Sequence, residues 1–528
     1  MARVNSKTES VTAMAYEHLP SRPNFKQIMP LKPCMPIGCL FDIPTCRWLT
    51  GAYGESLQNA GIGLITGVVG RGNRFKTTLT KWMIITILKR FVESIVDTYD
   101  TEMNVQEQDL FRFMRKAGLN LEDFFNPYGR DRWHITDESL YMADAWFEII
   151  KEFYDDKKKN LNKWLRQTPF LDRDGKTLLK LAVPNMLDVD SFSKFTTSDV
   201  LKLIDDNALG ESGGNTIYMR QGLSKKRFLS EIPRMAQAVN MPVFLTAHVG
   251  SMNGMQDNSR VPPPKRLQHM NQNEDIKGVT GDFSFLTSFC VHCVEASVFL
   301  NDKTKTVEYP KNSDDTLERD SDLNRLKIMY LRNKNGRSGL TAEILVSQNE
   351  GVLPSLTEFY YSKINDRDYE FAYNGNDKNY QHCFMPSINL SRTTVRTKLE
   401  VNERLRKAVL FGSELTQMHW LNQNTEDKYR VSAKKLFNDL KDRGYKIEEL
   451  LDTRSWWTFD NDKQSVPYLS TMDLLKMRVG EYHPYWMKTK PDDGFVQVPQ
   501  TYSVDADGVI ALPSISDQII EIPELIEV

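Results

Sequence analysis

Short apolar runs alternate with amphipathic stretches over residues 36–360, and this alternation constrains the fold more than any other feature of the sequence. Apolar runs of strand length, separated by helical patterns, predict a largely parallel sheet covered by helices. The runs lie at 62–69, 94–99, 181–189, 241–247, 290–300, 326–331 and 340–346, and the helical candidates at 77–91, 106–117, 137–154 and 223–239. We therefore expect an α/β core with a mostly parallel central sheet.

The regions outside this alternation have a different character. Residues 1–35 are polar and interrupted by prolines, which indicates an N-terminal arm that could serve in oligomerisation. Residues 155–180 look like an insertion with a hairpin-like D-R-D-G at 172–175. A smaller C-terminal domain, mainly helical or mixed, is expected over 371–490, with helices at 394–411 and 432–443 and an aromatic core from Trp420, Trp456, Trp457 and Trp486. The core would then span 36–370 and a mobile acidic tail 491–528.

The charge of the chain is divided unevenly along its length. The 68 basic and 70 acidic side chains give a net charge of −2, yet the tail holds eight acidic residues and no lysine or arginine. The remainder is therefore net positive, which suits a nucleic-acid partner better than the overall value does. These acidic residues are Asp492, Asp493, Asp505, Asp507, Asp517, Glu521, Glu524 and Glu527. The tail could compete with DNA for basic surfaces or merely keep the chain soluble.

The composition also limits the cellular compartments in which the protein is expected. No apolar run reaches the ~18 residues that a membrane helix needs, and the N-terminus has no apolar signal core. Six cysteines in 528 residues do not make a disulfide framework. We expect a protein of the cytoplasm, with no membrane partner.

A glycine-rich turn, G-R-G-N-R-F-K-T at 70–77, follows the first apolar run and opens an amphipathic helix. That context is typical of a P-loop, where backbone N–H groups and a helix N-terminus hold phosphates. Lys76 would reach the β- and γ-phosphates and Thr77 would bind Mg²⁺, although Phe75 stands where the second glycine is usual. The residues expected at the nucleotide are Gly70, Arg71, Gly72, Asn73, Arg74, Phe75, Lys76, Thr77 and Thr78. The alternative is an ordinary glycine-rich turn.

Polar side chains end three further apolar runs. Glu102 ends Y-D-T-E, Asp190 lies in V-D-S, and His248 ends T-A-H. Each alone could be an ordinary strand-end carboxylate or structural histidine, and Asp97 and Asp100 could be mistaken for Glu102. Together they predict one ligand-binding edge, because ligands bind outside the carboxyl ends of parallel strands. Glu102 would align a water molecule, Asp190 would support the metal, and His248 would contact the γ-phosphate.

These motifs resemble the RecA superfamily of recombinases, and most closely the UvsX recombinases of tailed phages, over residues 36–360. The F-K-T ending of the turn, Y-D-T-E, M-L-D-V-D-S-F-S and T-A-H-V-G carry the resemblance. Y-L-R-N-K-N-G at 330–336 is similar to the element whose basic residues reach the ATP of a neighbouring subunit, which places Arg332 and Lys334 there. S-Q-N-E-G-V at 347–352 resembles the turn that closes the core.

The resemblance implies a RecA-like P-loop ATPase core that uses ATP and Mg²⁺, with catalytic roles for Glu102, Asp190 and His248. It implies a helical filament on single-stranded DNA that pairs with homologous duplex DNA in recombination, repair and replication. A single-strand-binding or mediator protein would be a further partner. The compartment would be the host cytoplasm for a phage-encoded chain.

Two irregular segments resemble the family's DNA-binding loops. Residues 207–216 contain Gly213 and Gly214, and residues 249–282 contain the basic residues Arg260, Lys265, Arg266 and Lys277. Such side chains and glycine N–H groups suit DNA phosphates. Solvated surface loops are the alternative reading.

Two other functions are compatible with the same motifs. A hexameric replicative helicase of the same superfamily shares these motifs, but residues 1–35 are short for a helicase N-terminal domain. A filament accessory protein that binds DNA without exchanging strands is a second rival. Cys290 and Cys293 have C-x-x-C spacing, yet a strand would point them to opposite faces, which disfavours a zinc site.

Overall fold

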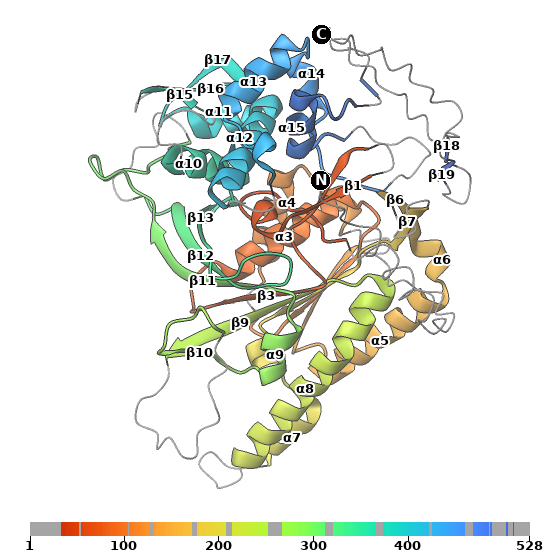
Figure 1. The fold of residues 1–528 in the computed structure, drawn as a ribbon. Coiled ribbons are helices and arrows are strands. Elements are labelled where there is room, and N and C mark those ends of the chain that lie inside the picture. The colour runs from red at the N-terminus through yellow and green to blue at the C-terminus, as the bar shows by residue number, and fades with distance from the viewer. Residues whose placement is uncertain are drawn as a thin grey trace, which may run out of the picture.

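The computed structural model describes the chain from residue 33 to 487 with internal gaps, together with two short strands beyond (Figure 1). The described ranges are 33–51, 54–103, 105–125, 131–171, 177–206, 214–251, 267–311, 320–365, 373–376, 379–421, 425–459, 468–484, 486–487, 503–504 and 510–511. The expected arm lies almost entirely outside them. So does the acidic tail, apart from the paired strands β18 (Ser503–Val504) and β19 (Ile510–Ala511).

A ten-stranded sheet forms the centre of the molecule and confirms the expected α/β class. Its strands lie in the order β14 (Gly351–Val352), β13 (Thr341–Ser347), β12 (Leu323–Asn333), β11 (Phe289–Val298), β3 (Ile65–Gly70), β9 (Val243–Ser251), β8 (Met186–Asp190), β4 (Val96–Asp100) and β5 (Trp133–Asp137), and β10 (Glu274–Ile276) pairs with β9. The strands from β11 to β5 pair in parallel, and β12, β13 and β14 continue the sheet antiparallel. All seven apolar runs of the sequence contribute strands to this sheet.

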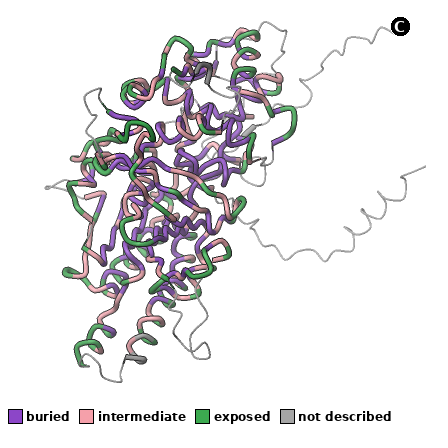
Figure 2. Tube along the Cα trace, turned by 90° about the vertical axis from the view of Figure 1, so that its left-hand side faces the viewer, coloured by how far each residue is buried: buried purple, intermediate pink, exposed green. Residues whose placement is uncertain are grey.

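Helices cover both faces of the sheet, because successive side chains of a strand point to opposite sides. Val68 belongs to a core cluster with residues of α3 (Lys76–Arg90) and α4 (Glu107–Ala117). Its neighbour Val69 belongs to a second cluster with residues of α5 (Ala143–Lys159), α8 (Gly214–Val239) and α9 (Gly281–Leu286). Buried positions accordingly concentrate along the middle of the molecule, whereas α7 (Ser198–Asp205) and the start of α8 project from it (Figures 1 and 2).

The helix expected at 137–154 begins later than the sequence indicated. Residues 133–137 form β5, a strand that the sequence analysis missed, and the helix runs over 143–159. Short polar strands at a sheet edge lack a strong apolar run, and β5 shows one fully buried side chain, Trp133. The segment 155–180 comprises the end of α5, α6 (Leu161–Trp164) and the antiparallel pair β6 (Leu165–Leu171) and β7 (Leu178–Ala182), while the D-R-D-G turn lies outside the described residues. Its status as an insertion stays a prediction.

The C-terminal part is a helical layer with a small sheet. It contains β15 (Tyr373–Asn376), β16 (Asn379–His382), β17 (Met385–Leu390), α11 (Val395–Val401), α12 (Glu403–Leu421), α13 (Ala433–Asp442), α14 (Ile447–Asp452) and α15 (Thr471–Val479). The helix expected at 394–411 is thus two helices that meet at Asn402. One apolar cluster joins β12, β13 and α10 (Pro354–Asn365) to α11 and α12, so burial continues across residue 370. The boundary at 370 stays a prediction.

The tryptophans do not form the single C-terminal core that we expected. Trp457 is 2% exposed and packs against Phe91 and Phe170 in the core of the main sheet. Trp486 packs on the helices of the C-terminal part, and Trp420 is half exposed. The chain therefore returns to the central sheet after α14. No local sequence pattern predicts this long-range contact.

The strand β2 (Ser56–Asn59), which pairs with β1 (Arg47–Thr50), is completed by the far end of the chain. The Ser56 backbone N–H donates to Asp473 Oδ1 at 2.6 Å, across 417 residues of sequence. Gln58 N–H donates to the Tyr468 hydroxyl at 3.1 Å, and its carbonyl accepts from Trp457 Nε1 at 3.2 Å. The open edge of β2 is closed by Trp457, Tyr468 and Asp473. The short helix α2 (Asp42–Thr45) precedes this pair.

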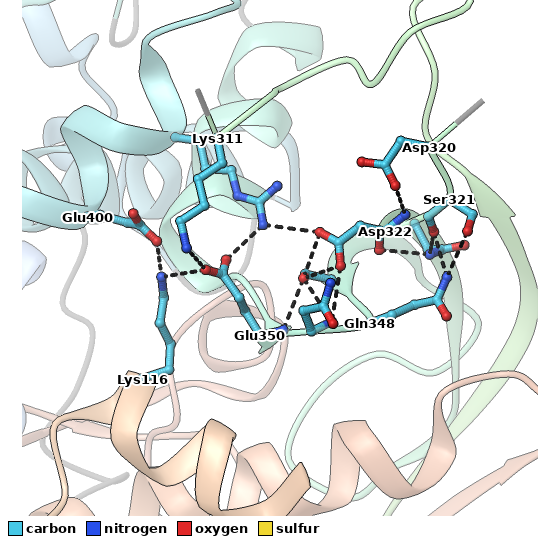
Figure 3. A network of polar contacts seen from close by, with 12 residues as sticks. Lys116, Lys311, Asp320, Ser321, Asp322, Gln348, Glu350 and Glu400 are labelled. Carbon is cyan, nitrogen blue, oxygen red and sulfur yellow. Dashed lines mark hydrogen bonds and ion pairs between the residues drawn. The ribbon is translucent and has the colours of Figure 1, made fainter. Parts of the chain in front are cut away.

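Six charged residues tie α4 and the β13–β14 turn to α11, and we call them the ionic joint (Figure 3). They are Lys116, Lys311, Asp322, Glu350, Arg396 and Glu400. Arg396, 5% exposed at its side chain, contacts Glu350 at 2.7 Å and Asp322 at 3.3 Å. Glu350 also accepts from Lys311 at 2.5 Å and Lys116 at 3.3 Å, and Lys116 pairs with Glu400. Burial raises the pKa of Glu350, but the bonds from Arg396 and Lys311 outweigh it and lower that pKa to about 2.

Among the described residues no helix is both long and apolar enough to cross a membrane.

Candidate active site

Four neighbouring strands end at one edge of the sheet and bring the predicted polar residues together. Gly70 at the end of β3 is the register partner of His248 on β9, and Asp190 at the end of β8 is the partner of Asp100 on β4. Because these strands are parallel, their carboxyl ends share that edge. The structure therefore brings Glu102, Asp190 and His248 to one edge, together with Lys76, the first residue of α3. The binding and catalytic roles assigned to these residues stay predictions.

The turn at 70–77 packs tightly at one end and is open at the other. A side chain at Gly70 would lie 2.9 Å from the Cys293 carbonyl oxygen on β11, so glycine is needed for this approach. Gly72 has open space around it, and Arg71, Gly72 and Asn73 are exposed. The Arg71 guanidinium contacts Glu274 of β10 at 3.2 Å. The exposed part of the turn is thus free to face a ligand.

Phe75 adopts the left-handed conformation that a glycine normally supplies. Its φ is 53°, and it precedes the first residue of α3. That conformation costs a residue with a Cβ roughly 1–2 kcal/mol. The ring packs against the main core cluster, which offsets part of this cost. The departure from the usual P-loop pattern therefore keeps the backbone shape while adding apolar contact.

Lys76 is a buried cation at the mouth of the turn. It is 8% exposed, and its Nζ donates to the Arg71 carbonyl oxygen at 2.9 Å. Burial lowers its pKa, against the opposing influence of Cys293, Asp190 and Glu102. An ammonium group held by a backbone carbonyl, near carboxylates that it does not contact directly, is well placed to bind an anion. Arg74 and the helix residues Thr77 and Thr78 are half-buried beside it.

Glu102 is held by groups from two other segments, the strand β9 and the stretch that follows β8. Its Oε1 lies 2.5 Å from His248 Nε2, 3.3 Å from Ser191 Oγ and 3.7 Å from Lys194 Nζ. Burial raises its pKa, but the His248 hydrogen bond and charge, with help from Lys194 and Ser191, lower it below the usual range. Glu102 is therefore a carboxylate at neutral pH, able to accept a hydrogen bond from water.

Neighbouring carboxylates shape the turn that carries Glu102. Asp100 accepts from the backbone N–H groups of Glu102 at 3.0 Å and Val105 at 2.7 Å. Asp97 accepts from Trp146 Nε1 at 2.6 Å and is a structural group. Thr101 exchanges hydrogen bonds with Ser191, its Oγ1 accepting from Ser191 N and donating to Ser191 O, both at 2.9 Å. These bonds fix Glu102 against the end of β8.

Asp190 has one oxygen engaged and one open. Thr246 Oγ1 donates to its Oδ1 at 2.5 Å, whereas Oδ2 is buried with no hydrogen-bond partner among the described residues. An unpartnered buried carboxylate oxygen calls for a cation or water. Together with the Thr77 hydroxyl it supplies the oxygen ligands that Mg²⁺ prefers. The residues present therefore fit a magnesium ion.

A buried ion pair behind Asp190 was missed by the sequence analysis. Lys81 of α3 pairs with Asp188 of β8, and Thr98 Oγ1 donates to the same Asp188 oxygen at 3.0 Å. Both charged side chains are almost completely buried. The signal was available, since Asp188 lies two residues before Asp190 on the same face of a strand. The pair fixes α3, and with it the phosphate turn, against the strand that carries Asp190.

A second network runs from His248 to the end of the predicted second DNA loop. The His248 backbone N–H donates to Ser193 Oγ, and Ser193 Oγ donates to the Lys277 carbonyl, both at 2.8 Å. Lys277 N–H returns to the His248 carbonyl at 2.8 Å. Lys225 Nζ of α8 joins Ser193 and Gly278 by donating to their carbonyls at 2.6 Å. His248 and the last residues of that loop thus belong to one bonded unit.

The predicted DNA-contacting residues are only partly described. Arg260, Lys265, Arg266 and Gly213 lie outside the described residues, and Gly214 begins α8. Lys277 is described, follows β10, and lies 3.7 Å from Asp275.

Arg332 and Lys334 lie at the opposite edge of the sheet from the phosphate turn. Arg332 on β12 is the register partner of Cys290 on β11, which pairs with Gly67, and Lys334 bonds through its N–H to the Ser288 carbonyl at 3.1 Å. At ~3.3 Å per residue they lie about 10–16 Å back along the strands from Gly70. They do not join the Lys76–Glu102 group of the same chain.

Cys290 and Cys293 are buried in different core clusters, on opposite faces of β11. Burial raises the pKa of each thiol to about 12.

No family model and no curated protein is significantly similar to this sequence. Among solved structures, the crystal structure of the RadB recombinase is similar to this chain with a TM-score of 0.30 and 14% sequence identity. That similarity covers 56% of this chain and 92% of RadB.

Proposed function

We propose that this chain is an ATP-dependent homologous recombinase that assembles as a helical filament on single-stranded DNA and pairs it with homologous duplex DNA. The observation that carries the proposal is the meeting of Lys76, Glu102, Asp190 and His248 at one sheet edge. The His248–Glu102 contact of 2.5 Å is its centre. The motif resemblance to UvsX recombinases of tailed phages supports the finer assignment, and with it a host-cell cytoplasmic location.

Each residue has a distinct task in this proposal. The backbone of 70–75 and the Lys76 ammonium bind the phosphates of ATP. Thr77 and Asp190 would hold Mg²⁺, which neutralises phosphate charge when bound. Glu102, kept ionised by its lowered pKa, orients the attacking water and accepts its proton.

His248 links nucleotide state to DNA binding. A γ-phosphate that accepted a hydrogen bond from His248 would compete with Glu102 for the same imidazole nitrogen. Because the His248 backbone is bonded to Ser193 and Lys277, such a change would reach the loop that precedes Lys277. ATP and ADP would then differ in the loop geometry they favour, as a population shift requires.

Arg332 and Lys334 complete the nucleotide site of a neighbouring copy. Their place at the opposite sheet edge supports action between subunits, since they lie away from the phosphate turn of their own chain. A single-strand-binding or mediator protein would help loading, and no membrane partner is proposed.

A strand-exchange assay tests the proposal. The wild-type chain with ATP should transfer a strand from duplex DNA to a homologous single strand, and Lys76→Ala should fail while remaining folded. Nucleotide-dependent duplex unwinding without exchange would favour the helicase, and rings of six seen by electron microscopy would agree with it. DNA-stimulated hydrolysis without exchange would favour the accessory protein.

A further inference from the structure

One ion pair joins the phosphate turn to β10. Arg71 Nη2 donates to Glu274 Oε1 at 3.2 Å, and among the described residues no other cationic side chain forms an ion pair with Glu274. The Arg71 side chain is 49% exposed, whereas the Glu274 side chain is 10% exposed. β10 lies within residues 249–282, the segment predicted to contact DNA. We call Arg71 and Glu274 the turn ion pair.

Glu274 is held from its other side by Asn271. Asn271 Nδ2 donates to Glu274 Oε2 at 3.0 Å, and the Asn271 carbonyl accepts from the Glu274 N–H at 3.1 Å. Glu274 is also the register partner of Ser251 at the end of β9. One carboxylate oxygen is therefore bonded within its own segment, and the other is bonded to the phosphate turn through Arg71.

The histidine nearest to this pair does not balance the charge of Glu274. Burial lowers the pKa of His292 on β11, which is 2% exposed, and the charges of Glu274 and Arg71 act on it in opposite directions. The imidazole is therefore neutral at pH 7. Arg71 is the group that neutralises Glu274, so a ligand that takes Arg71 away leaves this carboxylate without its cation.

A bound phosphate would compete with Glu274 for the Arg71 guanidinium. Arg71 belongs to the exposed part of the turn, and a guanidinium binds phosphate through charge-assisted, often bidentate hydrogen bonds. The contact with Glu274 joins one pair of atoms and involves a half-exposed side chain, a kind of ion pair that contributes little free energy. The phosphate contact is therefore the stronger of the two.

We propose that Glu274 competes with the nucleotide phosphates for Arg71, so that it limits nucleotide affinity and holds β10 against the turn until nucleotide binds. The inference rests on the proposed function, which places the phosphates at residues 70–77. Glu274 is then a positioning residue, because it acts through Arg71 and does not touch the reacting atoms. The turn ion pair uses none of the bonds that connect His248 to Ser193, so it is a separate connection between the nucleotide site and residues 249–282.

Nucleotide titration tests the competition. Glu274→Gln removes the charge and keeps the size of the side chain. Asp275→Asn is the matched control, because it removes the same charge one position further along β10, where the carboxylate lies 3.7 Å from Lys277. Isothermal titration calorimetry with Mg²⁺ and a non-hydrolysable ATP analogue, in the absence of DNA, measures the affinity. We expect Glu274→Gln to bind the analogue roughly two- to fivefold more tightly than wild type, the range for one exposed ion pair, and Asp275→Asn to match wild type.

Arg71→Gln shows whether the gain depends on the guanidinium. This variant should bind the analogue more weakly than wild type, and adding Glu274→Gln to it should produce no further gain, because the two residues act as one pair. A gain of affinity also separates the inference from a structural role, since a damaged fold would bind more weakly. An undiminished gain in the absence of Arg71 would overturn the competition.

Hydrogen–deuterium exchange over residues 268–280 tests the release of β10. In wild type the analogue should speed exchange of these amides, and in Glu274→Gln exchange should already be fast without nucleotide. Unchanged or weaker affinity in Glu274→Gln, an equal gain in Asp275→Asn, or exchange that does not respond to nucleotide in wild type would overturn the inference while leaving the proposed function in place. A wild-type chain that binds no nucleotide would overturn both.

Discussion

The phosphate-turn edge and the ionic joint both gather charged residues, but they use them in opposite ways. In the joint, Lys116, Glu350 and Arg396 each contact opposite charges from another segment. At the turn, Lys76 donates to a backbone carbonyl and Asp190 keeps a buried oxygen without a partner among the described residues. The turn edge also holds Asn73, Phe75 and Met103, three of the six non-glycine residues with positive φ in the described chain.

This difference separates binding from stability. Charged groups that pair with each other hold segments together and offer few free hydrogen-bonding positions to a ligand. Charged groups that lack an opposite partner can bind a ligand instead. Variants at the turn edge should therefore change activity at nearly constant stability, and variants in the joint should do the reverse. The following predictions test that contrast.

The largest effect is expected from Glu102→Gln. Loss of the carboxylate should lower the hydrolysis rate by roughly 10²–10⁴-fold, because the amide cannot accept the proton of the attacking water. Nucleotide affinity should change little, and the free energy of unfolding should stay within about 0.5 kcal/mol of wild type. Phosphate release, nucleotide titration and urea denaturation measure the three quantities. Unimpaired hydrolysis would point to another base.

Glu350→Gln should do the opposite. Arg396 would lose its 2.7 Å partner in a nearly buried position, which we expect to destabilise the fold by about 2 kcal/mol. Hydrolysis per folded molecule should stay within twofold of wild type. The control is Arg404→Gln at the exposed Arg404–Asp452 pair, where at most about 0.5 kcal/mol is expected. Equal losses of unfolding free energy in both variants would contradict the distinction between the ionic joint and an exposed surface ion pair.

The same joint predicts a pH dependence of stability. The folded pKa of Glu350 is about 2, below its unfolded value, so its contribution is complete above pH ~5 and is lost as pH falls towards 2. The stability difference between wild type and Glu350→Gln should therefore be largest at pH 7 and shrink steadily between pH 5 and 3. Urea denaturation of both proteins at matched pH values measures it. A constant or growing difference would contradict the assignment.

The smallest effect concerns Phe75. Because its φ is 53°, Phe75→Gly should be more stable than Phe75→Ala by about 1 kcal/mol, although glycine is usually the worse choice beside a helix. Both variants lose the packing of the ring, so the comparison isolates the backbone. An alanine variant at least as stable as the glycine variant would show that the turn carries no strain.

The sheet edge that carries the candidate site was predictable, because it depends on a local sequence signal that recurs from strand to strand. Each of Glu102, Asp190 and His248 ends an apolar run, and parallel pairing brings such ends together without further information. The same alternation predicted the strands of the sheet except β5 and the short strands β10 and β14. The sequence of β5, W-H-I-T-D, has too few apolar residues to distinguish it from the helix that follows.

What the sequence could not predict depends on pairs far apart along the chain. The partners of Arg396 come from residues 322 and 350, and Trp457 packs beside Phe91. No periodicity encodes which distant charge or ring will be the neighbour. The same holds for Ser193, whose position between His248 and Lys277 requires three segments to be in place.

The completion of β2 has a consequence for the time course of synthesis. Ser56 leaves the ribosome 417 residues before Asp473, which accepts its backbone N–H. At about 5–20 residues per second, the strand edge waits roughly 20–80 s for its partner. During that interval β1 and β2 present an unpaired strand edge, so chaperone binding or early association would act there first. The β1–β2 pair is therefore protected from aggregation only after the residues up to Asp473 have been synthesised.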